Sequence, residues 1–472
     1  MKALLFSRIF ATDTLAQRLS GAALVLIALL LVVLNAAGIS LSPNACSVLL
    51  LAALVIIAFA IHKTPGGITS LIGLLFLGTL VFVAARPLLA LAMQDETVYT
   101  LTWGATVDAR EESIYRLMAF WTIGVCSLFG GYFLFFRNAG YILKTLSERN
   151  RDYCKQSFAV AFLLVAALLP VMAKSRLGAA ASGGYEALYA SQAQYTFNAT
   201  RLIDFLAPLL FALAVLIGEK RYSRLMIAVI TVYILTGGLA GRRMEAGSWL
   251  LVALWHISTI QRKRVHLGWL LPGLAATVLL FQWMEMLRGG NGPENPLIVQ
   301  FFLNQGLTFL LPALSWQLPF PPMHSIIGSI LPMGAFYSIL GASSAETSTV
   351  GIYICSQSNP ALFAAGYGLG SSAYIEILYA CGQVLALYAA VCGMLGFLLR
   401  KWEEHASSGP VALFFLCACL PSMVSIQRGS LSTVTSQFIY LSAFMAVLYL
   451  FHFVQNICDL PSRRPGGIYA AN

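Results

Sequence analysis

The stretch LSGAALVLIALLLVVLNAAG, residues 19–38, contains no charged side chain. An α-helix rises 1.5 Å per residue, so these residues form a helix about 30 Å long, which matches the hydrocarbon thickness of a bilayer. Asn35-Ala36-Ala37 weakly resembles a signal-peptidase site, but similar apolar runs follow almost to the C-terminus. We therefore expect a retained signal anchor followed by further membrane crossings.

The composition of the whole chain also indicates a membrane environment. Hydrophobic residues make up 59% of the 472 residues and charged residues 10%, whereas about a quarter of the residues of soluble domains are charged. The formal net charge is +10, but the basic residues gather in short clusters between apolar runs, as the positive-inside rule predicts. Nucleic acid is therefore not expected as a partner, and the chain is predicted to be an all-α polytopic membrane protein.

Apolar runs of spanning length predict about 12 transmembrane helices in a single transmembrane domain, residues 1–472. The third run contains Arg86-Pro87, where a kink is expected. The runs lie at residues 19–38, 45–62, 67–93, 115–136, 157–173, 198–218, 225–240, 244–260, 266–287, 371–399, 410–427 and 434–454.

Basic clusters fall in every second loop, which predicts cytoplasmic N- and C-termini. Lys220-Arg221, Arg262-Lys263-Arg264 and Arg463-Arg464 are examples on the cytoplasmic side. On the other side all basic residues but one are arginine, whose planar guanidinium binds phosphate oxygens bidentately. We expect a phosphate-bearing or acidic ligand on that side. The alternative is that these arginines snorkel at helix ends and pair with nearby acids.

Residues 288–369 separate the predicted ninth and tenth helices and lie on the side away from the cytoplasm. The segment is rich in proline but remains hydrophobic and aromatic, which argues against disorder. Stretches 297–316 and 325–340 have the character of amphipathic or re-entrant helices. The sequence predicts a large periplasmic loop that is partly helical and caps the bundle.

The sequence TGGLAGRRMEAG, residues 236–247, predicts a tight outer turn between the seventh and eighth helices. Glycines let a backbone approach a ligand closely, and a helix N-terminus favours anions. Arg242 and Arg243 are therefore candidates to bind a pyrophosphate. The alternative is a short glycine hairpin in which Arg242 pairs with Glu245 one turn further on.

The other outer arginines are candidates for ligand binding as well: Arg176, Arg201, Arg288 and Arg428. Arg288 follows Glu285 by three residues, and Arg201 precedes Asp204 by the same interval. Residues at this spacing share a helix face, so the alternative is that the two charges of each pair only neutralise each other.

The sequence AGYGLGSSAYIEILYACG, residues 365–382, joins a glycine-rich turn to the tenth predicted helix. Glu376 lies about one turn inside the apolar run, where an ionisable group is costly and indicates function. Its alternative role is to pair with an arginine of a neighbouring helix. Tyr367 and Tyr374 are candidates to contact a glycan. His324, in the long loop, is a second candidate base.

Several motifs are absent from the sequence. The outer segments contain no His, Cys, Asp or Glu cluster with metal-ligand spacing, and the chain has no Asp-x-Asp, GxSxG or Walker sequence. We therefore expect neither a metal ion nor a cofactor.

With these features together, the chain resembles the O-antigen polymerases of the Wzy type, which are polytopic oligosaccharide repeat-unit polymerases. The resemblance rests on the hydropathy layout, the late outer loop and three local sequences: the Gly-x-Arg turn before Met244, the run Gly366–Ser372 leading to Glu376, and Arg428-Gly429-Ser430. Layout covers nearly the whole chain, whereas motif similarity covers about fifty residues. The doubled Arg242-Arg243 leaves open which arginine fills the family's position.

The resemblance implies a metal-independent glycosyltransferase in the bacterial inner membrane. Members transfer a growing glycan from undecaprenyl pyrophosphate to the sugar of another lipid-linked repeat unit at the periplasmic face. Arginines such as Arg288 would stabilise the charge that develops on the leaving pyrophosphate. Glu376 is the first candidate for the base and His324 the second. Besides the lipid-linked oligosaccharide and membrane lipids, a chain-length regulator is an expected partner.

Two other functions are compatible with the layout. The related O-antigen ligases share the many helices and the late loop but transfer glycan to lipid A core, and only the glycine-rich run 366–372 favours a polymerase. A lipid-linked oligosaccharide flippase or other transporter would also bind phosphates. A flippase would carry charges deep within its helices, whereas here they lie at the outer ends.

Overall fold

The computed structural model describes residues 2–94, 96–99, 111–137, 146–182, 199–239, 242–261, 263, 268, 272–273, 275–280, 296–332, 349–364 and 370–458. Throughout these ranges the regular elements are helices, and none is a strand. The predicted all-α fold class is confirmed.

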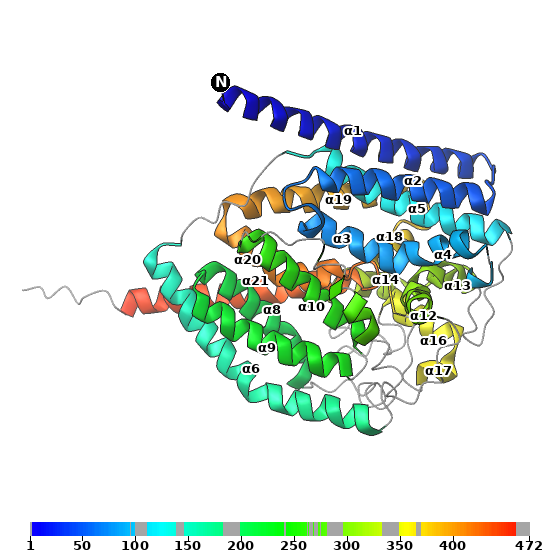
Figure 1. Cartoon of the computed structure of the whole chain (residues 1–472). Coiled ribbons are helices and arrows are strands. Elements are labelled where there is room, and N and C mark those ends of the chain that lie inside the picture. The colour runs from blue at the N-terminus through cyan, green and yellow to red at the C-terminus, as the bar shows by residue number, and fades with distance from the viewer. Residues whose placement is uncertain are drawn as a thin grey trace, which may run out of the picture.

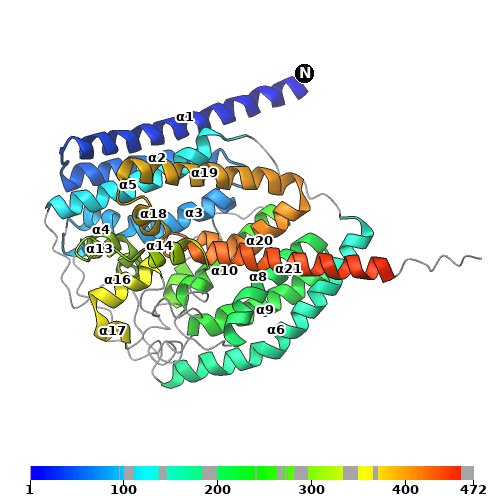
Figure 2. The ribbon, with the colours of Figure 1, turned by 180° about the vertical axis from the view of Figure 1, so that it is seen from behind.

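One group of long helices lies side by side at one edge of the molecule (Figures 1 and 2). It consists of α1 (Lys2–Ala36), α2 (Pro43–His62), α5 (Glu111–Leu134) and α19 (Leu385–Ser408). Helix α5 is almost entirely buried between α1 and α19. This group forms a scaffold beside the rest of the bundle.

Glycines bring α5 and α19 into direct backbone contact. A Cβ on Gly396 would lie 1.9 Å from the Leu128 carbonyl oxygen, and one on Gly131 would lie 2.0 Å from the Gly393 carbonyl oxygen. Such distances exclude any side chain, so only glycine permits this approach. Small residues perform this role in membrane bundles, because dispersion contacts replace the hydrophobic effect there.

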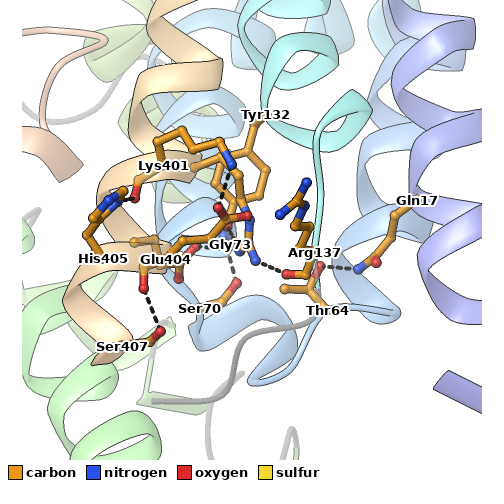
Figure 3. Close-up of polar contacts among 12 residues, drawn as sticks. Gln17, Thr64, Ser70, Gly73, Tyr132, Arg137, Lys401, Glu404, His405 and Ser407 are labelled. Carbon is orange, nitrogen blue, oxygen red and sulfur yellow. Dashed lines mark hydrogen bonds and ion pairs between the residues drawn. The ribbon is translucent and has the colours of Figure 1, made fainter. Parts of the chain in front are cut away.

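A buried ion cluster, which we call the α19 cluster, joins the same two helices (Figure 3). The Arg400 guanidinium lies 3.1 Å from Glu403 Oε2 and 3.2 Å from Glu404 Oε1. It also donates to the Arg137 carbonyl, while Tyr132 donates to Glu403. Lys401 Nζ lies 2.7 Å from Glu404 Oε2. Two cations therefore face two carboxylates, all carried by α19.

The second group of helices fills the other side of the bundle (Figure 1). It contains α6 (Glu148–Ser182), α8 (Ala199–Ile217), α9 (Lys220–Leu239), α10 (Arg243–Trp255) with the π-helical turn η4 (His256–Ile260), α20 (Pro410–Val424) and α21 (Leu431–Cys458). Helix α8 packs against α6, α9 and α20, which places it at the centre of this group.

The third predicted run is interrupted one turn before the expected kink. It consists of the 3-10 turn η1 (Gly67–Thr69), α3 (Leu71–Thr79), the π-helical turn η2 (Leu80–Ala84) and α4 (Ala85–Met93). Pro87 has no N–H to donate to the Val83 carbonyl, so the helix is irregular on the N-terminal side of the proline.

The predicted single helix over 371–399 is wrong. The structure has a short helix, α18 (Ala373–Ala380), and then α19 from Leu385. Between them Gly382 and Gln383 adopt positive φ values of 60° and 62°. Two consecutive left-handed residues cannot continue a right-handed helix, so the chain turns there.

Eight helical stretches within the described residues are long and apolar enough to cross a membrane. Three shorter apolar stretches lie at Leu202–Ile217, Pro410–Val424 and Leu431–Val447. The predicted count of about 12 is therefore not reached by the length criterion. The apolar composition and the apolar helices nonetheless show that the chain is a membrane protein.

The described parts of the long late segment, residues 296–332 and 349–364, contain several short helices. They hold α12 (Leu297–Gln305), the 3-10 turn η5 (Gly306–Leu310), α13 (Leu311–Ser315), α14 (Met323–Ile330), α16 (Val350–Ser358) and α17 (Pro360–Ala364). Leu297–Ser315 is itself one of the eight candidate spans, which the loop prediction did not foresee. Residues 333–340 of the second predicted amphipathic stretch lie outside the described residues.

Side chains of the bundle fix this late segment in place. Arg86 donates to the carbonyl of Leu303 at 3.0 Å and to that of Val98, in the 3-10 turn η3 (Glu96–Tyr99). Trp121 Nε1 donates to the Phe309 carbonyl at 2.8 Å. These bonds occupy backbone oxygens that would otherwise be buried without a donor.

Candidate functional site

Four charged side chains from three helices meet near the N-terminus of α10, and we call them the four-charge cluster. Arg176 of α6 lies 3.5 Å from both Asp204 of α8 and Glu245 of α10. Arg242, the residue before α10, lies 3.3 Å from Asp204 and 2.8 Å from Glu245. Each arginine thus contacts both carboxylates, which balances the charge of the group.

The two arginines differ in their access to solvent. The Arg176 side chain is 2% exposed and that of Arg242 is 23% exposed. Arg176 lies over the Tyr233 ring, 4.6 Å from its centroid, and the Tyr233 hydroxyl donates to Asp204 at 2.6 Å. Arg176 therefore forms the buried floor of the cluster and Arg242 its rim.

The glycine-rich sequence before α10 makes room for this arrangement. Gly237 belongs to α9, and a Cβ there would lie 3.1 Å from Arg176 Nη1. The Arg242 N–H donates to the Gly237 carbonyl at 2.8 Å. A side chain at position 237 would push Arg176 away from its partners, so this glycine permits the close approach.

The observed contacts of this cluster differ from the pairs that the sequence predicts. The expected Arg242–Glu245 pair is present, but it is only one contact of four. Asp204, expected to pair with Arg201, contacts Arg176 and Arg242. The side chain of Arg201 lies outside the described residues, so the expected pair stays a prediction. Arg176 had no local signal beyond an arginine in an outer segment, because its partners lie 28 and 69 residues away.

A second polar group surrounds Glu376 on α18, which is fully buried. The Ser371 hydroxyl donates to Glu376 Oε1 and the Leu431 N–H donates to Oε2, both at 2.8 Å. Among the residues that the structure describes, no arginine forms an ion pair with Glu376. Burial raises the pKa of Glu376 to about 7, although Leu431, Ser371, Ser430 and Ser329 act in the opposite direction.

Arg428 lies beside this glutamate, in the loop between α20 and α21. Its Nη1 donates to Gln305 Oε1 at 2.5 Å, and its carbonyl accepts the Ser371 N–H at 3.4 Å. A Cβ on Gly370 would lie 3.7 Å from Arg428 Nε. The arginine and the serine that contacts Glu376 are therefore neighbours.

Two helices connect the four-charge cluster with the Glu376 group. On α12, Phe301 packs in one hydrophobic cluster with Ala246, the neighbour of Glu245. Gln305, about 6 Å further along the α12 axis, accepts a hydrogen bond from Arg428 of the Glu376 group. On α21, Leu431 bonds Glu376. One and a half turns later Gln437 donates to the carbonyl of Phe205, the neighbour of Asp204. Figure 2 shows α21 running from α14 and α18 toward α8.

The remaining predicted residues are placed as follows. His324 is half-buried at the start of α14. Tyr374 is buried and meets the Trp121 ring edge-on at 5.5 Å, so it faces α5 and not the serines around Glu376. The side chains of Arg201 and Arg243, and all of Arg288 and Tyr367, lie outside the described residues. Where the structure describes the chain, no group of three His, Cys, Asp or Glu side chains is arranged to hold a metal ion.

The fold and these two groups define the class: a polytopic helical membrane protein with paired arginines and a buried carboxyl near the ends of its helices. The family of the O-antigen polysaccharide polymerase Wzy matches residues 22–458, and the chain belongs to this family. The family acts on lipid-linked oligosaccharide repeat units in the membrane. Searches of curated proteins and of solved structures give no match.

Proposed function

We propose that this protein is a membrane glycosyltransferase that polymerises undecaprenyl-pyrophosphate-linked repeat units at the periplasmic face of the bacterial inner membrane, with cytoplasmic termini. The four-charge cluster is the observation that carries this proposal. It holds two arginines together, partly open to solvent, in a chain of the O-antigen polymerase family.

Binding of the donor would exchange partners within the cluster. The two guanidinium groups are now held by Asp204 and Glu245, whose side chains are 32% and 19% exposed. A pyrophosphate offers the same kind of oxygens with more charge, so it competes for Arg242 first and then for Arg176. Arg243, Arg201 and Arg288 are further proposed contacts on the same side of the chain.

The arginines of the four-charge cluster would also stabilise the transition state of glycosyl transfer. When the bond between the anomeric carbon and the pyrophosphate breaks, negative charge grows on the leaving phosphate oxygen. Guanidinium groups fixed beside that oxygen stabilise the transition state more than the ground state. This fixed charge performs the task without a metal ion.

Glu376 is the proposed final acceptor of the proton from the attacking sugar hydroxyl. A base works best when its pKa lies near the working pH, and the pKa of Glu376 is about 7. The Arg428 carbonyl accepts the N–H of Ser371, which holds Glu376, and the Arg428 guanidinium, bonded to Gln305, is a further proposed contact for the glycan or pyrophosphate. A chain-length regulator and membrane lipids are proposed partners.

The surface glycan of cells lacking this protein tests the proposal. We expect lipid A core carrying one repeat unit with no longer ladder, because flipping and ligation survive while polymerisation is lost. Bare core with lipid-linked polymer in the periplasm would identify a ligase instead. Bare core with repeat units held on the cytoplasmic side would identify a flippase.

A further inference from the structure

Glu376 cannot touch a sugar directly in this structure. Its side chain is fully buried, and Oε2 is occupied by the N–H of Leu431, the first residue of α21. The other oxygen, Oε1, accepts from the hydroxyl of Ser371. Ser371 is only partly buried, so it stands between the carboxylate and the surface.

We propose that Ser371 is a catalytic residue that relays the proton of the acceptor hydroxyl to Glu376. The inference rests on the proposed function and specifies how its base is reached. A serine hydroxyl donates one hydrogen bond and accepts two. Ser371 therefore accepts from the sugar hydroxyl while it donates to Oε1, 2.8 Å away.

The surroundings hold Ser371 in the orientation that a relay needs. Its N–H donates to the Arg428 carbonyl, which ties it to the loop that also carries Ser430. On the other side, a Cβ on Gly351 would lie 2.5 Å from both Cβ and Oγ of Ser371. A glycine at position 351 is thus required to leave space for the serine hydroxyl.

The other serines near Glu376 also bond to other parts of the chain. Ser430 Oγ donates to the Ser329 carbonyl at 3.2 Å, and Ser329 Oγ accepts the Val350 N–H at 2.8 Å. Their hydrogen bonds join α14 and α16 to the loop before α21. Ser430 and Ser329 also lower the pKa of Glu376 by hydrogen bonding, but their hydroxyls are shared with these backbone groups. The Ser371 hydroxyl donates to Oε1 at 2.8 Å, which makes it the serine proposed as the relay.

The step balances as follows. The acceptor oxygen bonds to the anomeric carbon of the donor as its O–H bond breaks, and the bond from that carbon to the pyrophosphate breaks with its electron pair on the phosphate oxygen. The acceptor proton passes to Ser371 Oγ while the serine proton passes to Glu376 Oε1. The serine is unchanged and the glutamate gains one proton, which later returns by the same path to water or to the released pyrophosphate.

The test is the rate of polymer formation by the full-length protein in vesicles, supplied with undecaprenyl-pyrophosphate-linked repeat units, between pH 5.5 and 9. Glu376 must be ionised to accept a proton, so the wild-type rate should rise with pH through about 7. Ser371→Ala should lower the rate about 100-fold and abolish the rise, as should Glu376→Gln. The double variant should be no slower than either single one, because both act on one proton path.

Two further variants serve as comparisons. Ser430→Ala removes a second serine that lowers the pKa of Glu376, so the pH-dependent rise should be kept but move to higher pH. Ser358→Ala removes a hydroxyl that donates to the Cys355 carbonyl of its own helix, and should match the wild type. Membrane levels of each variant are measured alongside.

Several results would overturn the relay. They are a Ser371→Ala rate within twofold of wild type, a retained pH-dependent rise in that variant, or additive losses in the double variant. If Ser371→Ala does not accumulate in the membrane, Ser371→Cys is measured in its place. The thiol is a weak hydrogen-bond donor, so the rate of polymer formation should fall. An unchanged rate would contradict the relay. Failure of the proposed function is distinct, since it shows as bare core in cells lacking the protein.

Discussion

The α19 cluster and the four-charge cluster each place two cations against two carboxylates, yet they are built in different ways. In the α19 cluster Glu403 and Glu404 follow Arg400 by three and four residues on one helix, and all three side chains are nearly buried. The four-charge cluster draws Arg176, Asp204 and Arg242 from different parts of the chain, and its carboxylates are partly exposed.

On this difference rests our proposal that the α19 cluster is structural and that the four-charge cluster binds an anion. Acids one turn away on the same helix are present wherever the helix forms, so a ligand cannot easily displace them from Arg400. Asp204 comes from a different helix than either arginine and is 32% exposed, so it can move aside for a competing anion, whereas Glu245 follows Arg242 by one turn. A group of arginines and carboxylates is thus a candidate anion-binding site when a carboxylate is distant from the arginines in sequence and exposed to water.

The largest effect is expected from breaking the α19 cluster. Arg400→Ala leaves the Glu403 carboxylate buried without its partner, which costs about 3–5 kcal/mol. The protein should lose abundance in the membrane and unfold at a lower temperature in detergent, with polymer lost in proportion. Arg149→Ala, at an exposed arginine bonded to Tyr153, is the control and should be silent. Normal abundance for Arg400→Ala would contradict a structural role.

A smaller loss is expected when the contact between α5 and α19 is crowded. Gly396→Ala places a methyl group 1.9 Å from the Leu128 carbonyl oxygen, so the helices must separate. Such overpacking costs about 1–3 kcal/mol. The measurement is thermal unfolding in detergent. Gly178→Ala on α6, where a Cβ meets nothing within 4 Å, is the matched control and should not lower the unfolding temperature.

The four-charge cluster should respond in activity and not in abundance. Arg242→Lys keeps the charge but loses the bidentate fork, which we expect to reduce polymer formation about tenfold, since hydrogen bonds between charged groups are worth about 1.5–3 kcal/mol. The glycan ladder and the membrane level are measured together. Arg116→Lys, at an exposed arginine stacked on Trp316, is the control. Full-length polymer from Arg242→Lys, Arg243→Lys and Arg288→Lys alike would refute pyrophosphate binding by these arginines.

The smallest effect is expected at the edge of the α19 cluster. Lys401 pairs with Glu404 at 2.7 Å, but its side chain is 32% exposed. Exposed pairs on one helix contribute only about 0.3–0.5 kcal/mol. Lys401→Met should therefore leave both the unfolding temperature and the glycan ladder nearly unchanged. A loss as large as that of Arg400→Ala would mean that the whole cluster acts as one unit.

Hydropathy and local motifs predicted some features of the site but not its composition. Glycines and paired arginines in residues 236–247 indicate a turn and an anion site, and Arg242 is in the cluster, although α9 extends to Leu239 and α10 begins at Arg243. Tyr374 was grouped with Glu376 because they are neighbours in sequence. On a helix, residues two apart point to opposite sides, and Tyr374 accordingly faces Trp121 while Glu376 faces Leu431.

The sequence by itself determined that the chain is an all-helical membrane protein of the O-antigen polymerase family, because apolar length and family motifs are properties of consecutive residues. Only the tertiary structure decided that Arg176 lies under Arg242, that Asp204 joins them, and that Ser371 and Leu431 hold Glu376. These contacts depend on how helices far apart in sequence pack against one another. They also depend on glycines such as Gly237 and Gly351, whose missing side chains have an effect only through their neighbours in space.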